Sequence, residues 1–197
     1  MTPLSNSPVD ANGLETSVLR LWQEFLARYF DGGLHAVGAV ASVQFPKAEL
    51  HFQQSAVTQP LDGPAGGNQG ASGLAITMVW SEGDRRKWTA WESLRTANNP
   101  NGPNLGVATR QEICYEWVAW NFWVRAGGTN SRALCKSGSD GLFGLLSNKG
   151  ETHALGQKGI CRLKVHAPRV IQETEYALRL VSLGATLRYP ILSQTPA

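Results

Sequence analysis

Residues 110–125 read RQEICYEWVAWNFWVR, and this stretch decides the fold class. Its aromatic and β-branched residues favour a β-strand over a helix, and at about 3.3 Å per residue it would span about 50 Å. Both faces of such a strand are apolar, so each must be covered, either by helices of the same chain or by a neighbouring subunit. One face would carry Ile113, Tyr115, Trp117, Ala119 and Trp123, and the other would carry Cys114, Val118, Trp120, Phe122 and Val124.

One helix is expected before this strand in the sequence and another after it. Apolar residues recur at helical spacing over 14–30 and again over 131–147. We expect Asn12 to cap the first helix, with Glu15 completing a capping box, and glycines at 32–33 to end it. Three glycines of the second helix lie near one another on its surface, which predicts close packing onto the sheet; they are Gly138, Gly141 and Gly144.

The other strands are expected where β-branched and apolar residues alternate between turn signals. Residues 82–84 (EGD) predict the turn of a hairpin, and Gly184 predicts a bend or bulge in the last strand. The expected strands are 36–45, 48–53, 74–81, 85–94, 110–125, 160–166 and 175–189, and the expected loops are 58–72, 96–109 and 149–159.

This order of elements predicts an α+β fold. We expect a mostly antiparallel sheet with two helices packed on one face and long loops between strands. A chain of 197 residues fits one domain, here 14–192, preceded by an extended arm at 1–13 and followed by a short tail at 193–197.

Composition and charge exclude several classes of protein. A hydrophobic content of 42% and a charged content of 17% exclude a mostly disordered chain. The N-terminus has no signal-peptide pattern, and no apolar run is long enough to cross a membrane. The net charge is +3, with −2 over residues 1–60 and +5 over the remainder, which is not the clustered basic field of a dedicated DNA-binding protein.

Signatures of catalysis and cofactor binding are absent from the sequence. No metal-ligand spacing joins the four histidines and three cysteines, so we expect no metal and no disulfide, with Cys114, Cys135 and Cys161 as reduced thiols. No phosphate-binding loop or nucleophile motif occurs, and we expect neither a cofactor nor enzymatic activity. Two weaker alternatives remain: Cys114 as a nucleophile, and Glu112 with Glu116 as a carboxylate pair for glycoside chemistry.

The most suggestive polar feature is a group of basic residues interleaved with tryptophans. Arg85, Arg86 and Lys87 precede Trp88 and Trp91, and Arg95 follows them. Such a pattern can hold single-stranded nucleic acid or touch a DNA backbone. It also describes an ordinary hairpin tip whose aromatic residues are buried.

Two stretches carry a resemblance to a known family, NSRALCKSGSDGLFGLL at 130–146 and PRVIQETEYALRLVSLGATLRYPIL at 168–192. Together with the order of elements over 14–192, they resemble the tail terminator (tail-tube completion) proteins of long-tailed bacteriophages. The resemblance implies a structural virion protein, assembled in the host cytoplasm, with no catalytic residues. It implies a homo-oligomeric ring, a hexamer in the family, that caps the tail tube and joins it to the head-completion or stopper protein, with DNA passing through the lumen. Another neck protein, such as a stopper or adaptor, or a minor tail protein is the alternative, and a single-stranded nucleic-acid-binding module is a further one.

Assembly would require surfaces that contact other subunits or partners. We expect the loops 58–72 and 96–109 to reach axial partners and the cations of 85–95 to face DNA or the lumen. The aromatic residues expected at subunit or partner contacts are Trp88, Trp91, Trp117, Trp120 and Trp123, and the expected DNA-backbone or lumen contacts are Arg85, Arg86, Lys87 and Arg95.

Overall fold

The computed structural model describes residues 4, 9–10, 13–37, 42–53, 73–95, 108–173 and 176–191. The expected loop 58–72, most of the loop 96–109, the Asn12 cap and the tail 193–197 lie outside these residues.

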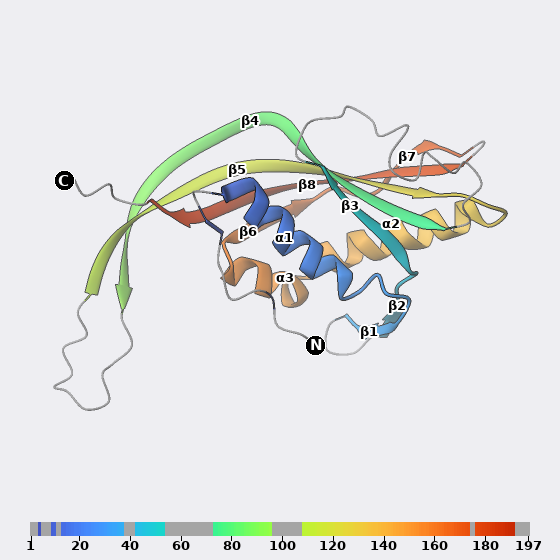
Figure 1. The fold of residues 1–197 in the computed structure, drawn as a ribbon, viewed down its shortest axis with the longest axis horizontal. Coiled ribbons are helices and arrows are strands. Elements are labelled where there is room, and N and C mark those ends of the chain that lie inside the picture. The colour runs from blue at the N-terminus through green and yellow to red at the C-terminus, as the bar shows by residue number, and fades with distance from the viewer. Residues whose placement is uncertain are drawn as a thin grey trace.

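A mixed, mostly antiparallel sheet forms the centre of the molecule (Figure 1). Its strand order is β3-β4-β5-β8-β6, and β7 pairs with β8. Only β3 and β4 run parallel; the other neighbours are antiparallel. The strands are β3 (Ala48–Gln53), β4 (Leu74–Arg95), β5 (Ala108–Ala126), β6 (Ile160–Val165), β7 (Arg169–Gln172) and β8 (Ala177–Pro190).

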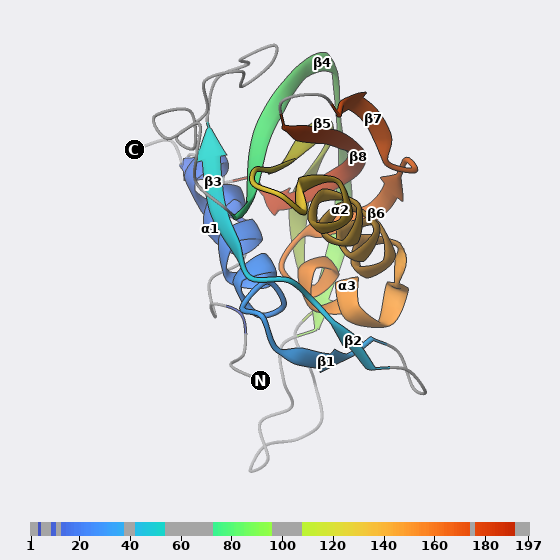
Figure 2. The ribbon, with the colours of Figure 1, turned by 90° about the vertical axis from the view of Figure 1, so that its right-hand side faces the viewer.

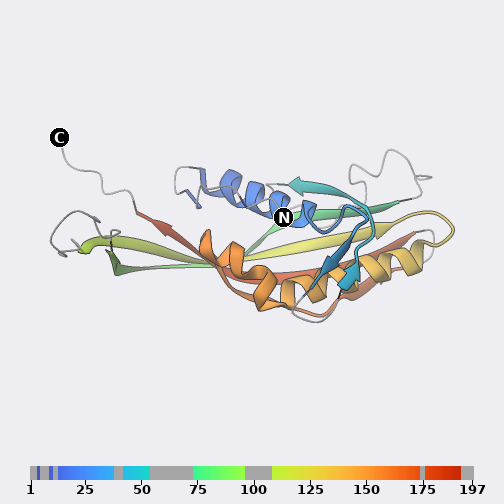
Figure 3. The ribbon, with the colours of Figure 1, turned by 90° about the horizontal axis from the view of Figure 1, so that it is seen from below.

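Three helices pack on the same face of this sheet, as the end-on view in Figure 2 and the view from below in Figure 3 show. They are α1 (Leu14–Ala27), α2 (Ser131–Ser147) and α3 (Lys149–Gln157). The α+β class and the placement of helices on one face are as the sequence predicts. We call the face under the helices the covered face and the opposite one the open face.

The alternation of β5 is confirmed along most of its length. Its even-numbered residues from Cys114 to Ala126 point to the covered face and are buried, whereas most odd-numbered residues are only partly buried. Trp120 has no exposed surface and forms the centre of the core. Its ring lies edge-on to those of Trp22 from α1 and Trp80 from β4, each with a centroid distance of 5.4 Å.

Two glycines of α2 permit close packing onto the rest of the chain. A Cβ atom on Gly138 would lie 2.6 Å from Leu74 Cδ2, and one on Gly141 would lie 3.3 Å from the ring of Phe45. A Cβ atom on Gly144 would meet nothing within 4 Å. The predicted close packing onto the sheet therefore holds for Gly138, whereas Gly141 packs against Phe45, which lies outside the strands.

The predicted hairpin at 82–84 is wrong. Residues 74–95 form one long strand, β4, whose two halves both pair with β5, with a shift in register between Ser81 and Arg86. The turn residues are accommodated as a bulge within the strand, because β5 is long enough to pair with both halves.

The predicted loop 149–159 is also wrong, since most of it forms α3. The side chain of Asn148 caps this helix by accepting hydrogen bonds from the backbone N–H groups of Gly150 (2.9 Å) and Glu151 (3.4 Å). An Asn three residues before a Glu is a capping signal that the sequence contained. Tyr29, two residues after the end of α1, donates a hydrogen bond from its hydroxyl to Glu151 of α3 and so joins the end of α1 to α3.

The structure differs from the sequence-based prediction in three smaller ways. The expected strand 36–45 is replaced by two short strands, β1 (Leu34–Ala36) and β2 (Ser42–Gln44), which pair with each other. The first helix begins after Gly13, with no side-chain cap. The last strand stays in register with β5 at Gly184, and the bulge lies instead in the neighbouring β6. Gly184 is needed because a Cβ there would lie 2.4 Å from the ring of Trp117.

Replacing Trp120 with alanine should destabilise the protein by about 3–5 kcal/mol, because it opens a cavity between the rings of Trp22 and Trp80. Urea unfolding followed by circular dichroism measures the change. Leu34→Ala, at a side chain that is 70% exposed, is the control and should shift the free energy of unfolding by less than about 0.5 kcal/mol. Similar losses for both variants would contradict the assignment of Trp120 to the core.

Candidate functional site

The β4 and β5 strands extend beyond the rest of the sheet as a two-stranded ribbon (Figure 1). The last residue of β8, Pro190, pairs with Ile113 of β5. Beyond this point the strand residues 91–95 and 108–112 form ladder pairs only with each other within the described chain, and the backbone oxygen of Glu112 also accepts a hydrogen bond of 3.0 Å from the N–H of Ile191. We call these residues the ribbon arm.

Two of the five tryptophans predicted as contacts are exposed, and both lie on or beside the ribbon arm. Trp91, opposite Glu112, is 57% exposed. Trp88 is 41% exposed on the open face and stacks against Tyr115, with ring centroids 5.5 Å apart and planes at 8°. The opposite orientations of Trp88 and Trp91 agree with the predicted alternation.

The other three predicted contact residues pack against other parts of the same chain. Trp120 is completely buried in the core, so it packs within the chain and is not the predicted contact with a partner. Trp123 is 7% exposed and packs against Val79, Leu178 and Leu180 on the open face. Trp117 is partly buried and its ring lies against Gly184.

Of the predicted cationic contacts, only Lys87 has a described side chain. Its Nζ lies 3.3 Å from Glu116 Oε2. The backbones of Arg85, Arg86 and Arg95 belong to β4, while their side chains lie outside the described part. The described member of this group is thus already paired with a carboxylate of the same chain.

A buried polar cluster surrounds Glu116 at the base of the ribbon arm. Glu116 is completely buried and accepts a hydrogen bond of 3.0 Å from the hydroxyl of Tyr189. Burial raises the pKa of Tyr189 well above its usual range, and hydrogen bonds to Cys114 and Glu116 raise it further. The cluster joins β4, β5 and β8, because Lys87, Glu116 and Tyr189 lie on these three strands in turn.

The structure places the two groups considered for catalysis, Cys114 and the pair Glu112 and Glu116, on β5. Cys114 is buried and lies directly opposite Tyr189 in the strand ladder. Glu116 interacts with Lys87 and Tyr189, while Glu112 lies four residues away on the same strand, within the ribbon arm.

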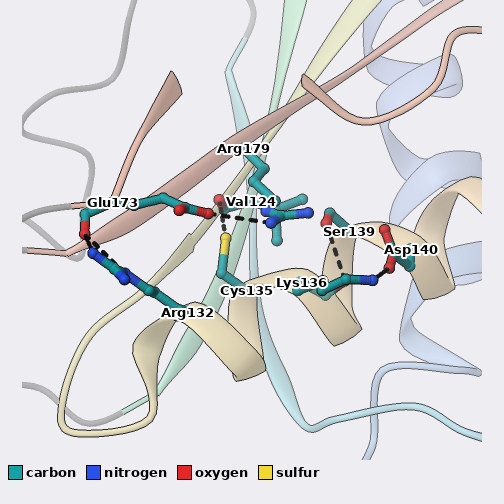
Figure 4. Close-up of polar contacts among 8 residues, drawn as sticks. All are labelled: Val124, Arg132, Cys135, Lys136, Ser139, Asp140, Glu173 and Arg179. Carbon is teal, nitrogen blue, oxygen red and sulfur yellow. Dashed lines mark hydrogen bonds and ion pairs between the residues drawn. The ribbon is translucent and has the colours of Figure 1, made fainter. Parts of the chain in front are cut away.

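A second polar cluster fixes the start of α2 (Figure 4). Both Nε and Nη2 of Arg132 donate to the backbone oxygen of Glu173, at 3.1 and 2.9 Å, and Arg179 Nη2 lies 3.2 Å from Glu173 Oε1. Nearby, the thiol of Cys135 donates to the backbone oxygen of Val124 at 3.1 Å, and burial raises its pKa to about 11. The thiol therefore stays protonated at neutral pH, which suits packing and not nucleophilic chemistry.

The sheet edge formed by β6 and β7 carries a basic surface that the sequence analysis did not identify. The side chains of Arg162, Lys164, His166 and Arg169 are exposed there. Residues 152–172 and 177–191 contain six of the 18 Lys and Arg residues and none of the 15 Asp and Glu residues. The signal in the sequence is the stretch 152–172, which contains four Lys and Arg residues and no acidic residue before Glu173.

One cleft of about 420 Å³ lies beside this edge, between α3 and β6. Lys149, His153 and Arg162 are among the residues that line it. Arg162 has a φ of 53°, in the left-handed region, at the bulge where β6 shifts register. Over the described ranges, no three His, Cys, Asp or Glu residues are grouped as metal ligands would be, and no helix has the length and apolar character to cross a membrane.

Replacing Lys87 with alanine should destabilise the fold by about 2 kcal/mol, because it removes the ammonium group that lies 3.3 Å from the buried carboxylate of Glu116. The free energy of unfolding measured in urea tests this. Lys136→Ala removes a surface partner of Asp140 and should cost less than about 0.5 kcal/mol. A Lys87→Ala variant as stable as Lys136→Ala would show that the Glu116 cluster does not hold the base of the arm.

In comparison with known proteins, the sequence matches no protein-family model. No curated protein is significantly similar to it either. The surfaces described above are therefore the basis for any argument about function.

Proposed function

We propose that this chain is a structural virion protein that forms a ring at the end of a bacteriophage tail tube. In this proposal the ring caps the tube, joins it to a head-completion or stopper protein in the neck, and lets DNA pass through its lumen. The observation that carries the proposal is the ribbon arm with Trp91 exposed on it.

Physical chemistry gives the ribbon arm a reason to bind another molecule. An isolated two-stranded ribbon is marginally stable in water and gains from a further packing surface. Trp91 is 57% exposed, and a large aromatic side chain is among the strongest contributors to protein interfaces. Within the described chain no third strand pairs with the two strands of the arm, and a sheet edge of this kind can pair with a strand of a neighbour.

A second copy of the chain is the partner that fits this arrangement in a ring. The arm of one subunit would contact a different surface of the next, and a repeated contact of this kind closes into a ring when its rotation allows. The resemblance of residues 130–146 and 168–192 to tail terminator proteins, with the α+β fold, supports the placement at the tail tube.

A structural and not catalytic role also agrees with the site geometry. The thiols of Cys114 and Cys135 and the carboxylate of Glu116 are buried within packing and hydrogen-bonding contacts. The partners named here, the tail tube protein and the head-completion or stopper protein, are part of the proposal.

Light scattering of the purified protein tests the ring. We expect a mass of about six copies, and we expect Trp91→Ala to shift the population to monomers, because the variant loses the main apolar contact of the arm. Leu34→Ala, which removes another exposed apolar side chain away from the arm, is the matched control and should leave the mass unchanged. A wild-type monomer at all concentrations, or equal effects of the two variants, would contradict the proposal.

A further inference from the structure

Aromatic and basic side chains lie side by side on the open face of the sheet. Arg188 of β8, Tyr115 of β5 and Trp88 of β4 occupy one cross-strand row, since each is the register partner of the next. Trp88 is 41% exposed and stacks on Tyr115, so the other side of its indole ring is available to a third ring. In the next row along the strands, Trp117 lies opposite Thr186 and adds a second, partly buried indole.

A line of basic residues borders these aromatic rings along the sheet edge. Lys164 pairs with Gly184, the backbone N–H of His166 bonds to Ser182, and Arg169 pairs with Leu180. These three partners are alternate residues of β8, so the basic positions follow one another at intervals of about 6.7 Å along one face. Arg188 continues the same face toward Tyr115 and Trp88.

The basic line is not neutralised within the described chain. None of Lys164, His166 and Arg169 forms an ion pair there. On the open face, Glu49 of β3 belongs to the opposite edge of the sheet, because β4, β5 and β8 separate β3 from β6. The described residues therefore supply no carboxylate that pairs with this line.

Protection of a free sheet edge accounts for only part of this pattern. A single inward lysine is enough to discourage edge pairing between proteins. Edge protection also gives no reason for a stacked, exposed tryptophan on the same face of β4, which β8 and β5 separate from this edge. A line of cations beside aromatic rings is the arrangement that binds single-stranded nucleic acid, whose phosphates meet the cations and whose bases stack on the rings.

We propose that the open face binds single-stranded nucleic acid, with Lys164 and Arg169 contacting phosphates and Trp88 stacking on a base. This site is distinct from the predicted cations at 85–95, of which the described member, Lys87, is paired with Glu116. The inference does not depend on ring formation, since all of its residues belong to one chain.

Fluorescence anisotropy of a labelled oligothymidine of about 20 nucleotides, titrated with the full-length protein at several salt concentrations, tests the site. We expect the double variant Lys164→Ala/Arg169→Ala to weaken binding about tenfold and to make the slope of log K against log salt shallower by roughly 1.4. The control Lys47→Ala/Lys136→Ala removes the same charge from exposed positions elsewhere and should bind as the wild type does.

The stacking contribution is tested by a second pair of variants. Trp88→Ala should weaken binding about tenfold, whereas Trp88→Phe, which keeps an aromatic ring for stacking, should bind much as the wild type does. Absence of binding at low salt, or equal losses in the variants and their controls, would overturn the inference. Duplex DNA that binds as tightly as the oligothymidine, with no effect of Trp88→Ala, would also overturn it in favour of a duplex backbone. Light scattering of the same samples reports ring formation separately, so either proposal can fail alone.

Discussion

Burial of the even-numbered face of β5 beneath three helices is the constraint on which the rest of the structure depends. Trp120 lies between Trp22 and Trp80, and this cluster joins α1, β4 and β5 in one core. With that face committed to the core, the opposite residues of β5 either pack against their neighbours on β4 and β8, as Trp123 does, or meet solvent. The open face exists because the helices cover only one side of the sheet. The ribbon arm exists because β4 and β5 continue past Pro190, where β8 ends.

The sequence predicted those parts of the fold that local pattern determines. The two faces of β5 and the bounds of α2 follow from periodicity alone, and the structure confirms them. The β4 strand was divided wrongly because residues 82–84 have the composition of a turn, and only pairing with β5, distant in sequence, turns them into a bulge. The short β7 and the β1–β2 pair have partners only about ten residues away, but strands of three or four residues are too short to show a clear alternation in the sequence.

The candidate surfaces were predicted in part, for a similar reason. Trp88 and Trp91 were recognised as possible contacts, and both are exposed. Trp120 has the same composition-based signal, but its position under α1 makes it a core residue. The basic line at the β6–β7 edge could not be predicted from the sequence, because its residues share a face with Tyr115 and Trp88 only when β8 pairs with both β5 and β6. Charge counted over short segments does not show a surface assembled from three strands.

The central claim is that copies of this chain meet through the ribbon arm while the helical face holds the fold. Hydrogen–deuterium exchange of the native protein, compared with the Trp91→Ala variant under the same conditions, tests it most directly. The account predicts slow exchange at residues 91–95 and 108–112 in the wild type, fast exchange there in the variant, and no difference in α2 or β8. Equal exchange of the arm in both proteins, or a difference confined to the helices, would contradict it.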